Sequence, residues 1–303
     1  MSVGLVHSRT WFRTTAPAMG STAELLIDGP PSLMPHAIAR LDELEQVWSR
    51  FRPDSELNRL HEQSSRWVHV SHELFTAFRW CQRLHAETDG RFDPTVRGAL
   101  EQWGYDRTFR EIDTRRTAPT TCPAPGLAGL ELRRQDEAVR LAPGMRIDLG
   151  GIGKGLAADL LSAELLSHGA VGAYVCLGGD IAVAGIPPDE GWDVPLVHPA
   201  TDQELATHVV HRGALVMSTV CQRRWRLADG TEAHHLIDPA SGAPCTSDLL
   251  AVAVAAASAA RAEGLAKAAL IAGTERGAAL LRAAAVDAWL VSDEGVITVE
   301  ADR

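Results

Sequence analysis

The sequence lacks the basic runs that nucleic-acid binding requires. Its 303 residues contain 29 Lys and Arg against 39 Asp and Glu, which gives a formal net charge of −10. Nucleic-acid phosphates demand a concentrated positive surface. The densest basic segments, residues 133–134 and 223–226, are too short to provide one. We therefore expect no nucleic-acid partner.

Long apolar runs are also absent. No stretch reaches the roughly 18 residues of a membrane span. The longest candidate, residues 249–260, is alanine-rich and ends at Arg261. The first 19 residues show no apolar segment followed by a cleavage site and no cysteine for a lipid, since the first cysteine is Cys81. We expect no membrane insertion and a cytoplasmic location.

Cysteines are few, and they do not form a recognisable framework. The five are odd in number, widely scattered and without a C-x-x-C pair. This pattern fits neither a disulfide scaffold nor a zinc cage. The remaining composition, 46% hydrophobic and 22% charged, is that of an ordinary globular chain long enough for a large core.

Short strands and helices alternate along the chain, and hairpins dominate its middle. Apolar spacing predicts helices at residues 33–48, 72–88, 156–168, 261–272 and 275–284. Strands are predicted at 23–27, 130–132, 138–141, 145–149, 171–177, 181–184, 192–197, 208–211, 214–217, 249–255, 288–292 and 296–300. The polar, proline-rich residues 108–129 should form a surface loop. This order predicts an α+β fold with mainly antiparallel mixed sheets flanked by helices.

The strongest local pattern is D-L-G-G-I-G-K-G at residues 148–155, between a predicted strand and a helix. Glycines let the backbone approach a ligand, and a helix N-terminus favours anions. Lys154 adds positive charge where a diphosphate would lie. The spacing is neither G-x-G-x-x-G nor a Walker A loop, because Gly155 and not Ser or Thr follows the lysine. A tight turn without a ligand would have the same pattern, so both interpretations stay open here.

A second pattern, H-H-L-I-D-P-A-S-G at residues 234–242, places histidines beside a rigid turn. Such a histidine can act as a general base. Two adjacent histidines also raise the question of a metal, but neighbouring side chains point apart in an extended chain. A purely structural turn is the commoner explanation of this pattern taken alone.

Taken in order, these and other segments resemble the ApbE flavin transferases. The matching segments are M-G-S at 19–21, S-R-F-R-P-D-S-E-L-N at 49–58, D-G-R-F-D-P-T-V at 89–96, W-G at 103–104, the glycine loop at 148–155, L-G-G-D-I at 177–181, S-T at 218–219 and H-L-I-D-P-A-S-G at 235–242. The resemblance covers most of the chain. It implies a single ApbE-like domain over residues 18–303, preceded by an N-terminal extension, residues 1–17.

The resemblance also implies an activity. Such enzymes transfer FMN from FAD to a Thr or Ser hydroxyl of an acceptor flavoprotein that carries a Thr-containing motif, and they release AMP. His235 would take the hydroxyl proton, with a pKa near its ordinary value of about 6.5. The residues expected to line the FAD site are Met19, Phe51, Arg91, Phe92, Asp93, Asp148, Lys154 and Ile237.

The expected Mg²⁺ site departs from the family pattern. The family's metal-binding helix reads A-D-x-x-x-T, whereas this chain has A-E-G-L-A-K at residues 262–267. Glu263 keeps an oxygen donor in place of Asp. Lys267 cannot replace Thr as a ligand, because an ammonium group has no lone pair to offer a cation. The backbone carbonyl of Gly151 is the remaining expected ligand.

Several alternatives follow from this departure. Glu263 and Gly151 could still bind Mg²⁺ while Lys267 turns away, or the Lys267 ammonium could take the place of the metal. The chain could instead be a non-catalytic FAD-binding protein, or a FAD pyrophosphatase in which water replaces the acceptor hydroxyl. An ordinary Glu–Lys contact on a helix surface would explain the pair without any ligand. We favour a working transferase with an altered metal site.

Overall fold

One antiparallel sheet contains the longest strands of the molecule. The computed structural model describes residues 10–301. The sheet order is β1-β2-β6-β7-β10-β15-β16-β17, and every neighbouring pair is antiparallel. These strands are β1 (Trp11–Ala18), β2 (Ser21–Asp28), β6 (Gly172–Leu177), β7 (Asp180–Gly185), β10 (Gly213–Thr219), β15 (Ala251–Ala256), β16 (Asp287–Ser292) and β17 (Gly295–Val299). The predicted α+β class with mainly antiparallel sheet is confirmed.

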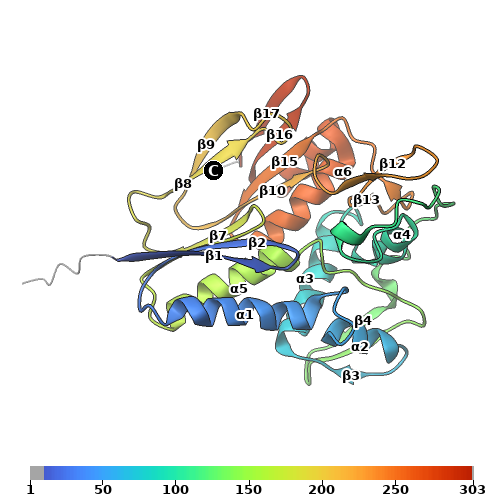
Figure 1. Ribbon diagram of the computed structural model, residues 1–303, viewed down its shortest axis with the longest axis horizontal. Coiled ribbons are helices and arrows are strands. Elements are labelled where there is room, and N and C mark those ends of the chain that lie inside the picture. Colours follow the sequence, from blue (N-terminus) through green and yellow to red (C-terminus); the bar gives the residue numbers. More distant parts are fainter. Residues whose placement is uncertain (1–9, 302–303) are drawn as a thin grey trace, which may run out of the picture.

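Helices cover one face of this sheet (Figure 1). They are α1 (Leu33–Trp48), α2 (Glu56–Glu62), α3 (His72–Glu87), α4 (Arg97–Gln102), α5 (Gly153–Ser167) and α6 (Ala259–Ala283), with short 3₁₀ turns η1 (Pro94–Val96), η2 (Phe109–Glu111) and η3 (Leu127–Gly129). Helix α5 packs on β6 and β7, and α6 packs on β10 and β15. Across residues 10–301, no helix has the length and apolarity to cross a membrane.

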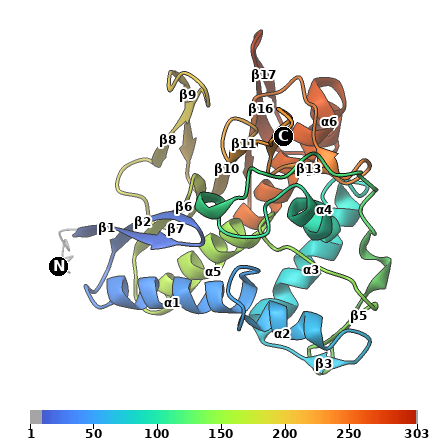
Figure 2. The same cartoon turned by 45° about the vertical axis from the view of Figure 1, so that its right-hand side comes forward.

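In the described part of the chain, four smaller sheets accompany the main one. They are β3 (Val68–His69), β5 (Ala138–Leu141) and β4 (Leu130–Arg133); β8 (Trp192–Val197) and β9 (Glu204–Val210); β11 (Arg224–Arg226) and β12 (Glu232–His234); and β13 (Ile237–Asp238) and β14 (Ala243–Pro244). The β8–β9 hairpin lies on the side of the sheet opposite α1 (Figure 2). The sheet therefore has apolar partners on both faces.

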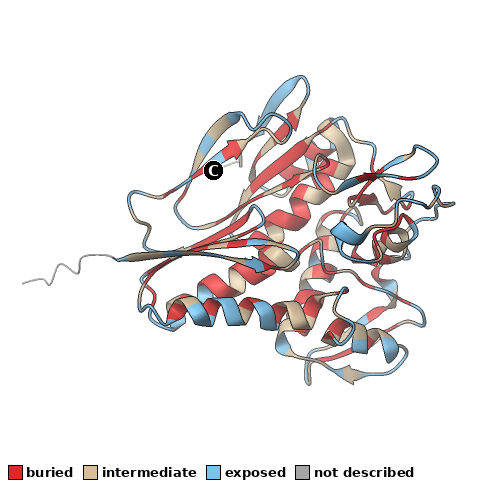
Figure 3. Cartoon of the chain, in the orientation of Figure 1, coloured by how far each residue is buried: buried red, intermediate tan, exposed pale blue. Residues whose placement is uncertain are grey.

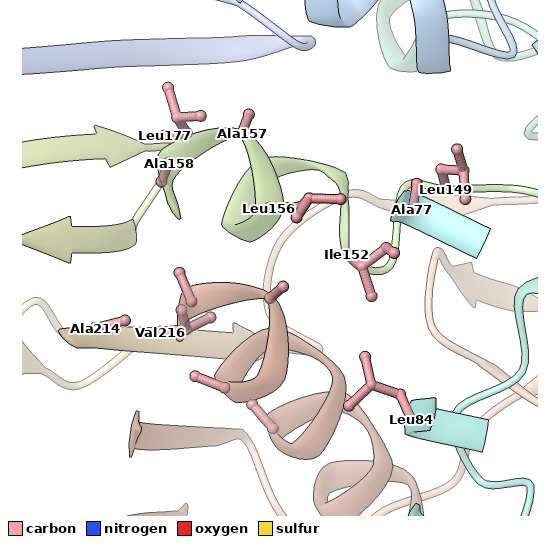
Figure 4. Close-up of a cluster of buried hydrophobic side chains, with 14 of the residues drawn as sticks. Ala77, Leu84, Leu149, Ile152, Leu156, Ala157, Ala158, Leu177, Ala214 and Val216 are labelled. Atoms are coloured by element: carbon pink, nitrogen blue, oxygen red, sulfur yellow. The ribbon is translucent and has the colours of Figure 1, made fainter. Parts of the chain in front are cut away.

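Strand residues alternate between two cores, as the period of two in a strand requires. Ala214 and Val216 of β10 face the large core beneath the helices (Figure 4), whereas Leu215 packs against the β8–β9 hairpin. About half of α5 and most of the first half of α6 are buried (Figure 3). A hydrophobic face on each side of the sheet thus fixes its position between helices and hairpin.

Helices α5 and α6 cross closely, and each caps the other. A Cβ at Gly155 would lie only 2.5 Å from the carbonyl oxygen of Ala259, so the crossing requires glycine there. Asp159 of α5 accepts hydrogen bonds from the backbone N–H groups of Ala259 (2.8 Å) and Ala260 (3.0 Å) at the start of α6. Glu263 of α6 in turn accepts one from the N–H of Gly155 (2.8 Å) at the start of α5. Carboxylates are favourable at both helix N-termini.

The strand predicted at residues 145–149 is wrong. The N–H of Ile147 donates to the ring Nε2 of His61 (3.0 Å), and the N–H of Asp148 donates to the carbonyl of Pro94 (2.8 Å). A side chain and a turn therefore satisfy these backbone groups, and the segment is an extended loop that enters α5. The other predicted strands are present, with ends displaced by no more than four residues.

Two further findings concern the predicted boundaries of elements. The two helices predicted at residues 261–272 and 275–284 are confirmed, because α6 is interrupted at Gly273, whose backbone is non-helical (φ 79°), and its second part ends at the C-cap Ala284. The predicted N-terminal extension, residues 1–17, includes residues 1–9, which lie outside the described residues. Its remainder contributes to β1, an edge strand of the main sheet that the sequence did not predict.

Candidate functional site

A cavity of about 1100 Å³ opens beside the start of α5. It lies between the β1–β2 turn, the end of α1, the glycine loop and the segment that follows β12. Eleven of the twelve predicted site residues line it: Met19, Phe51, Arg91, Phe92, Asp93, Asp148, Gly151, Lys154, His235, Ile237 and Lys267. The twelfth, Glu263, is fully buried behind the wall. Segments far apart in the sequence thus meet at one hollow.

A strained hairpin turn forms one rim of the cavity. Ala18 pairs with Ser21, so that Met19 and Gly20 alone make the turn, and both have positive φ (50° and 68°). Positive φ at both positions is the geometry of a type I′ hairpin, and it is unusual for a residue such as methionine. The N–H of Met19 donates to Glu45 on α1 (3.0 Å), which holds the strained residue over the cavity.

Aromatic rings and a guanidinium form a second wall. The rings of Phe51 and Tyr105 lie 5.6 Å apart, and the Arg50 guanidinium lies 4.1 and 4.6 Å from their centroids. The ring of Phe109 lies 6.4 Å from that of Tyr105, nearly perpendicular to it. Flat rings of this kind offer stacking surfaces to a planar ligand.

Arg50 links this aromatic wall to the glycine loop. Its Nη1 donates to the carbonyl of Tyr105 (2.6 Å), and its Nε lies 3.3 Å from the Asp148 carboxylate. Its Nη2 is buried without a hydrogen-bond partner among the described residues. A buried donor without a partner costs free energy, so a ligand that offers a hydrogen-bond acceptor here would bind more tightly. Arg50 stands in the motif at residues 49–58, but its role was not predicted from the sequence.

The glycine loop is shaped by its neighbours. Asp148 accepts a hydrogen bond from the N–H of Gly150 (2.9 Å) while its other oxygen faces Arg50. A Cβ at Gly151 would lie 2.9 Å from the ring of Phe92 and 3.8 Å from the Lys267 side chain. Gly151 therefore lets the loop pass between these two side chains. The carboxylate of Asp93 caps η1 and accepts from the N–H of Thr95 (2.8 Å).

Four charged side chains form a network at the deep end of the cavity. Lys267 Nζ lies 2.8 Å and Lys154 Nζ 3.2 Å from the same oxygen, Oε1 of Glu263. Lys154 also donates to Asp180 at the start of β7. Glu263 and Asp180 are almost fully buried, whereas the two lysines reach the cavity wall. The two ammonium groups and two carboxylates balance each other in charge.

The pKa values of the network follow from this balance. Burial opposes ionisation of Glu263, but the ammonium groups of Lys154 and Lys267 outweigh it and lower its pKa to about 2. Burial raises the pKa of Asp180 to about 6; the Lys154 charge opposes this shift and the Glu263 charge adds to it. Burial alone would lower the pKa of Lys154, yet the two carboxylates raise it. Lys154 therefore presents fixed positive charge at neutral pH.

His235 and His234 have different environments. The Nε2 of His234 donates to the carbonyl of Cys245 (3.1 Å), and its Nδ1 accepts from the N–H of Leu236 (3.3 Å), so its ring is structural. The Nδ1 of His235 is buried without a partner among the described residues. Burial lowers the pKa of His235 well below 6.5, and the charges of Arg223, Lys267 and Lys154 lower it further. The prediction of a pKa near 6.5 is therefore wrong.

The residues at the expected metal site do not fit Mg²⁺. Both oxygens of Glu263 are engaged, Oε1 by two ammonium groups and Oε2 by the N–H of Gly155. Lys267 offers no lone pair and lines the cavity beside Gly151. Over the described range 10–301, no group of three or more His, Cys, Asp or Glu side chains could hold a metal ion. Octahedral oxygen coordination of Mg²⁺ is thus not provided by these side chains.

Three further residues of the site were not predicted from the sequence. Tyr105 contributes to the aromatic wall, and Asp180 holds Lys154. Arg223 lines the cavity with a positive φ of 49°, and its guanidinium lies 3.4 Å from both the Tyr105 hydroxyl and the Gly20 carbonyl. Asp180 and Tyr105 lie in or beside quoted motifs, which was the available signal. Nothing local marks Arg223 except a short basic segment.

Positive charge prevails in the cavity of an otherwise acidic chain. Seven Lys and Arg side chains line it, against four Asp and Glu, although the whole chain carries −10. Arg91 and Arg223 form no ion pair with any described acidic residue. Aromatic walls beside unbalanced cations suit a planar ligand that carries negative charge, which is the chemistry of a nucleotide.

The chain belongs to the ApbE family, whose model matches residues 19–290. A relative from Treponema pallidum named FAD:protein FMN transferase is 30% identical over 259 residues, which cover 80% of this chain and 72% of that protein. A relative from Vibrio cholerae with the same name is 27% identical over 300 residues, covering 93% and 88%. The resemblance stated from the motifs is confirmed.

Solved structures share the fold. The ApbE protein of Thermotoga maritima has a TM-score of 0.84 at 22% identity, covering 96% of this chain and 97% of that one. The flavin transferase ApbE of Vibrio cholerae has a TM-score of 0.79 at 24% identity, covering 97% and 98%. The ApbE-like fold class predicted from the sequence is therefore confirmed.

Proposed function

We propose that this protein transfers FMN from FAD to a hydroxyl group of an acceptor flavoprotein and releases AMP. The names of its family relatives, FAD:protein FMN transferase, support this activity. The single observation that carries it is the position of His235, a neutral imidazole with a free buried Nδ1, in the same cavity wall as Lys154, Lys267 and Arg223. A base and a set of cations are what phosphoryl transfer to a hydroxyl needs.

The proposed step is a displacement at phosphorus. The acceptor hydroxyl oxygen forms a bond to the FMN phosphorus of FAD, and the bond from that phosphorus to the AMP phosphate breaks. The hydroxyl proton goes to His235, and AMP leaves. The cations stabilise the negative charge that builds up on the diphosphate oxygens. As the diphosphate enters, its charge offsets Arg223, Lys267 and Lys154, so the pKa of His235 rises and the imidazole becomes a stronger base.

Other residues hold the donor in place. In this proposal Phe51 and Tyr105 stack against a ring of FAD, with Arg50 between them and the glycine loop. Met19, Arg91, Phe92, Asp93 and Ile237 complete the cavity wall. Asp148 shapes the loop through Gly150. A Thr-containing acceptor motif, a single domain from residue 18 onward and a cytoplasmic location remain predictions from the sequence.

The test is an FMN-transfer assay with a Thr-bearing acceptor peptide. Mass spectrometry reports the mass of FMN added to the peptide, and chromatography reports AMP. We expect both products with the wild type, and at least a hundredfold slower transfer with His235→Ala, as loss of a general base predicts. His69→Ala, at an exposed histidine outside the cavity, is the matched control. AMP and free FMN without peptide addition would mean hydrolysis, and FAD binding without either product would overturn the proposal.

A further inference from the structure

The position that the family resemblance assigns to a metal ion contains protein ammonium groups. Lys267 Nζ contacts Glu263 Oε1 at 2.8 Å, and Lys154 Nζ contacts the same oxygen at 3.2 Å. The Lys267 side chain lies beside Gly151, the other expected ligand. A cation bound to Glu263 would have to displace both ammonium groups from a carboxylate that is fully buried.

The network holds these ammonium groups in fixed positions. Glu263 also accepts the N–H of Gly155 at 2.8 Å, so its carboxylate cannot rotate without losing a bond to α5. Lys154 is held on its other side by Asp180. Both lysines nevertheless line the cavity, with 18% and 14% of their side chains exposed. Charge that is positioned before the ligand arrives is the kind that stabilises a transition state without reorganisation.

The cavity carries positive charge in addition to that of the Lys154–Lys267 network. Two carboxylates balance Lys154 and Lys267. Arg223 lines the same cavity, and its hydrogen-bond acceptors within residues 10–301 are the neutral oxygens of Tyr105 and Gly20. A planar guanidinium suits bidentate binding of phosphate oxygens. The cavity therefore presents a net positive charge built from side chains.

We propose that Lys267, together with Lys154 and Arg223, supplies the charge that a divalent cation would otherwise supply, so that the protein binds the FAD diphosphate and transfers FMN without a metal. The inference rests on the proposed function for its transfer step. Its binding step stands on the cavity alone, because FAD affinity can be measured without any acceptor. A lysine ammonium is covalently attached to the chain, so a chelator such as EDTA cannot remove it.

The first experiment compares wild-type protein in EDTA and in Mg²⁺. FAD binding is followed by quenching of flavin fluorescence, and transfer by mass spectrometry. We expect the Kd for FAD to differ by less than about twofold between the two conditions, well below the tenfold change that 1.4 kcal/mol would produce. We expect transfer in EDTA as well. Loss of FAD binding in EDTA, or binding in neither condition, would overturn the inference.

Two substitutions at one position sharpen the test. Lys267→Met removes the charge and should weaken FAD binding on the order of tenfold, with no rescue by Mg²⁺, since a charged hydrogen bond is lost. Lys267→Thr removes the ammonium and adds an oxygen ligand four residues after Glu263. Its FAD binding should become dependent on Mg²⁺, which titration with Mg²⁺ alone and with FAD present would detect.

Arg276→Met is the matched control, because it removes a positive charge from an exposed site on the same helix outside the cavity. It should leave the Kd for FAD unchanged in both conditions. If Lys267→Met binds FAD as the wild type does, the ammonium has no role and the inference fails. FAD binding that survives EDTA without transfer in either condition would contradict the proposed function while supporting the charge replacement.

Discussion

Glu263 accepts hydrogen bonds from two ammonium groups and one backbone N–H, although its side chain is fully buried. Glu263→Gln keeps the size but removes the charge, which leaves Lys154 paired with Asp180 and leaves Lys267 without an ion-pair partner among the described residues. Removing one partner from a buried pair costs several kcal/mol, and the partial exposure of both lysines places the expected loss at about 3 kcal/mol. Urea unfolding measures it.

Glu232→Gln serves as the comparison. Glu232 pairs with Arg224 and Arg226 on the surface, where solvent screens the charges. We expect little change in the urea midpoint for this variant. Equal midpoints for the two variants would mean that the buried network contributes no stability.

The pH dependence of transfer depends on His235. Burial and nearby cations lower its pKa well below 6.5, so the free protein keeps a neutral base as the pH falls through 6.5. A plot of kcat/KM against pH, which reports the free enzyme, should show no acid limb centred near 6.5. Lys267→Met removes one of the charges that lower this pKa, so any acid limb should move to higher pH in that variant. A wild-type limb near 6.5 would contradict this assignment.

Single residues of the site were predictable only where they stand in a recognisable local pattern. Lys154 and His235 follow or precede glycine and proline turns whose spacing is visible in the sequence. The pairing of Lys154 with Asp180 and Glu263 spans 26 and 109 residues. Such contacts arise from the crossing of helices and strands, so no local pattern predicts them. The lowered pKa of His235 depends on the same long-range neighbours.

Among the elements, the α5–α6 crossing makes a specific demand on one glycine. In Gly155→Ala the new methyl group would lie 2.5 Å from the Ala259 carbonyl oxygen, and backbone cannot move aside as a flexible side chain can. Overpacking of this kind costs about 1–3 kcal/mol, more than alanine gains in helix propensity. We expect a loss of about 2 kcal/mol in unfolding free energy and weaker FAD binding, because Lys154 precedes this residue.

Gly98 offers a matched control within α4. A Cβ there meets nothing within 4 Å, and its backbone does not have positive φ. Gly98→Ala should therefore leave the unfolding free energy unchanged or raise it by up to about 1 kcal/mol. A loss similar to that of Gly155→Ala would show that the crossing is not the cause.

Elements with a clear apolar period were predicted well. Helix α3 buries Leu74, Phe78 and Leu84 on one face, and its bounds match the prediction to one residue. Residues 145–149 are apolar enough for a strand, but their backbone partners are His61 and Pro94. An apolar run shows that a segment is buried without showing which groups its backbone bonds. The edge strand β1 was missed because its sequence, with Pro17 near its end, has no apolar run.

For the whole molecule, the contrast between an acidic chain and a basic cavity has a measurable result. The net charge of −10 repels FAD at long range, whereas the cavity attracts its diphosphate at short range. At 0.1 M salt, interactions between exposed charges are largely screened beyond about 10 Å. FAD binding should weaken with added NaCl because the partly exposed Lys154, Lys267 and Arg223 are screened. Fluorescence titration at low and high salt measures the change.

Riboflavin, which has the same ring system without phosphate, is the control ligand. Its binding should depend little on salt, because it would contact only the aromatic wall around Phe51 and Tyr105. An equal salt dependence for the two ligands would show that the cations do not contact the diphosphate.

The mutual caps of α5 and α6 join two stretches of chain that lie about a hundred residues apart. When either helix frays at its first turn, it loses its hydrogen bonds to a carboxylate of the other helix. The amide protons of Gly155, Ala259 and Ala260 should therefore exchange with solvent deuterium in a single shared opening, at one common rate, rather than as independent events. The first turns of α5 and α6, beside the cavity, would then open together or remain closed together.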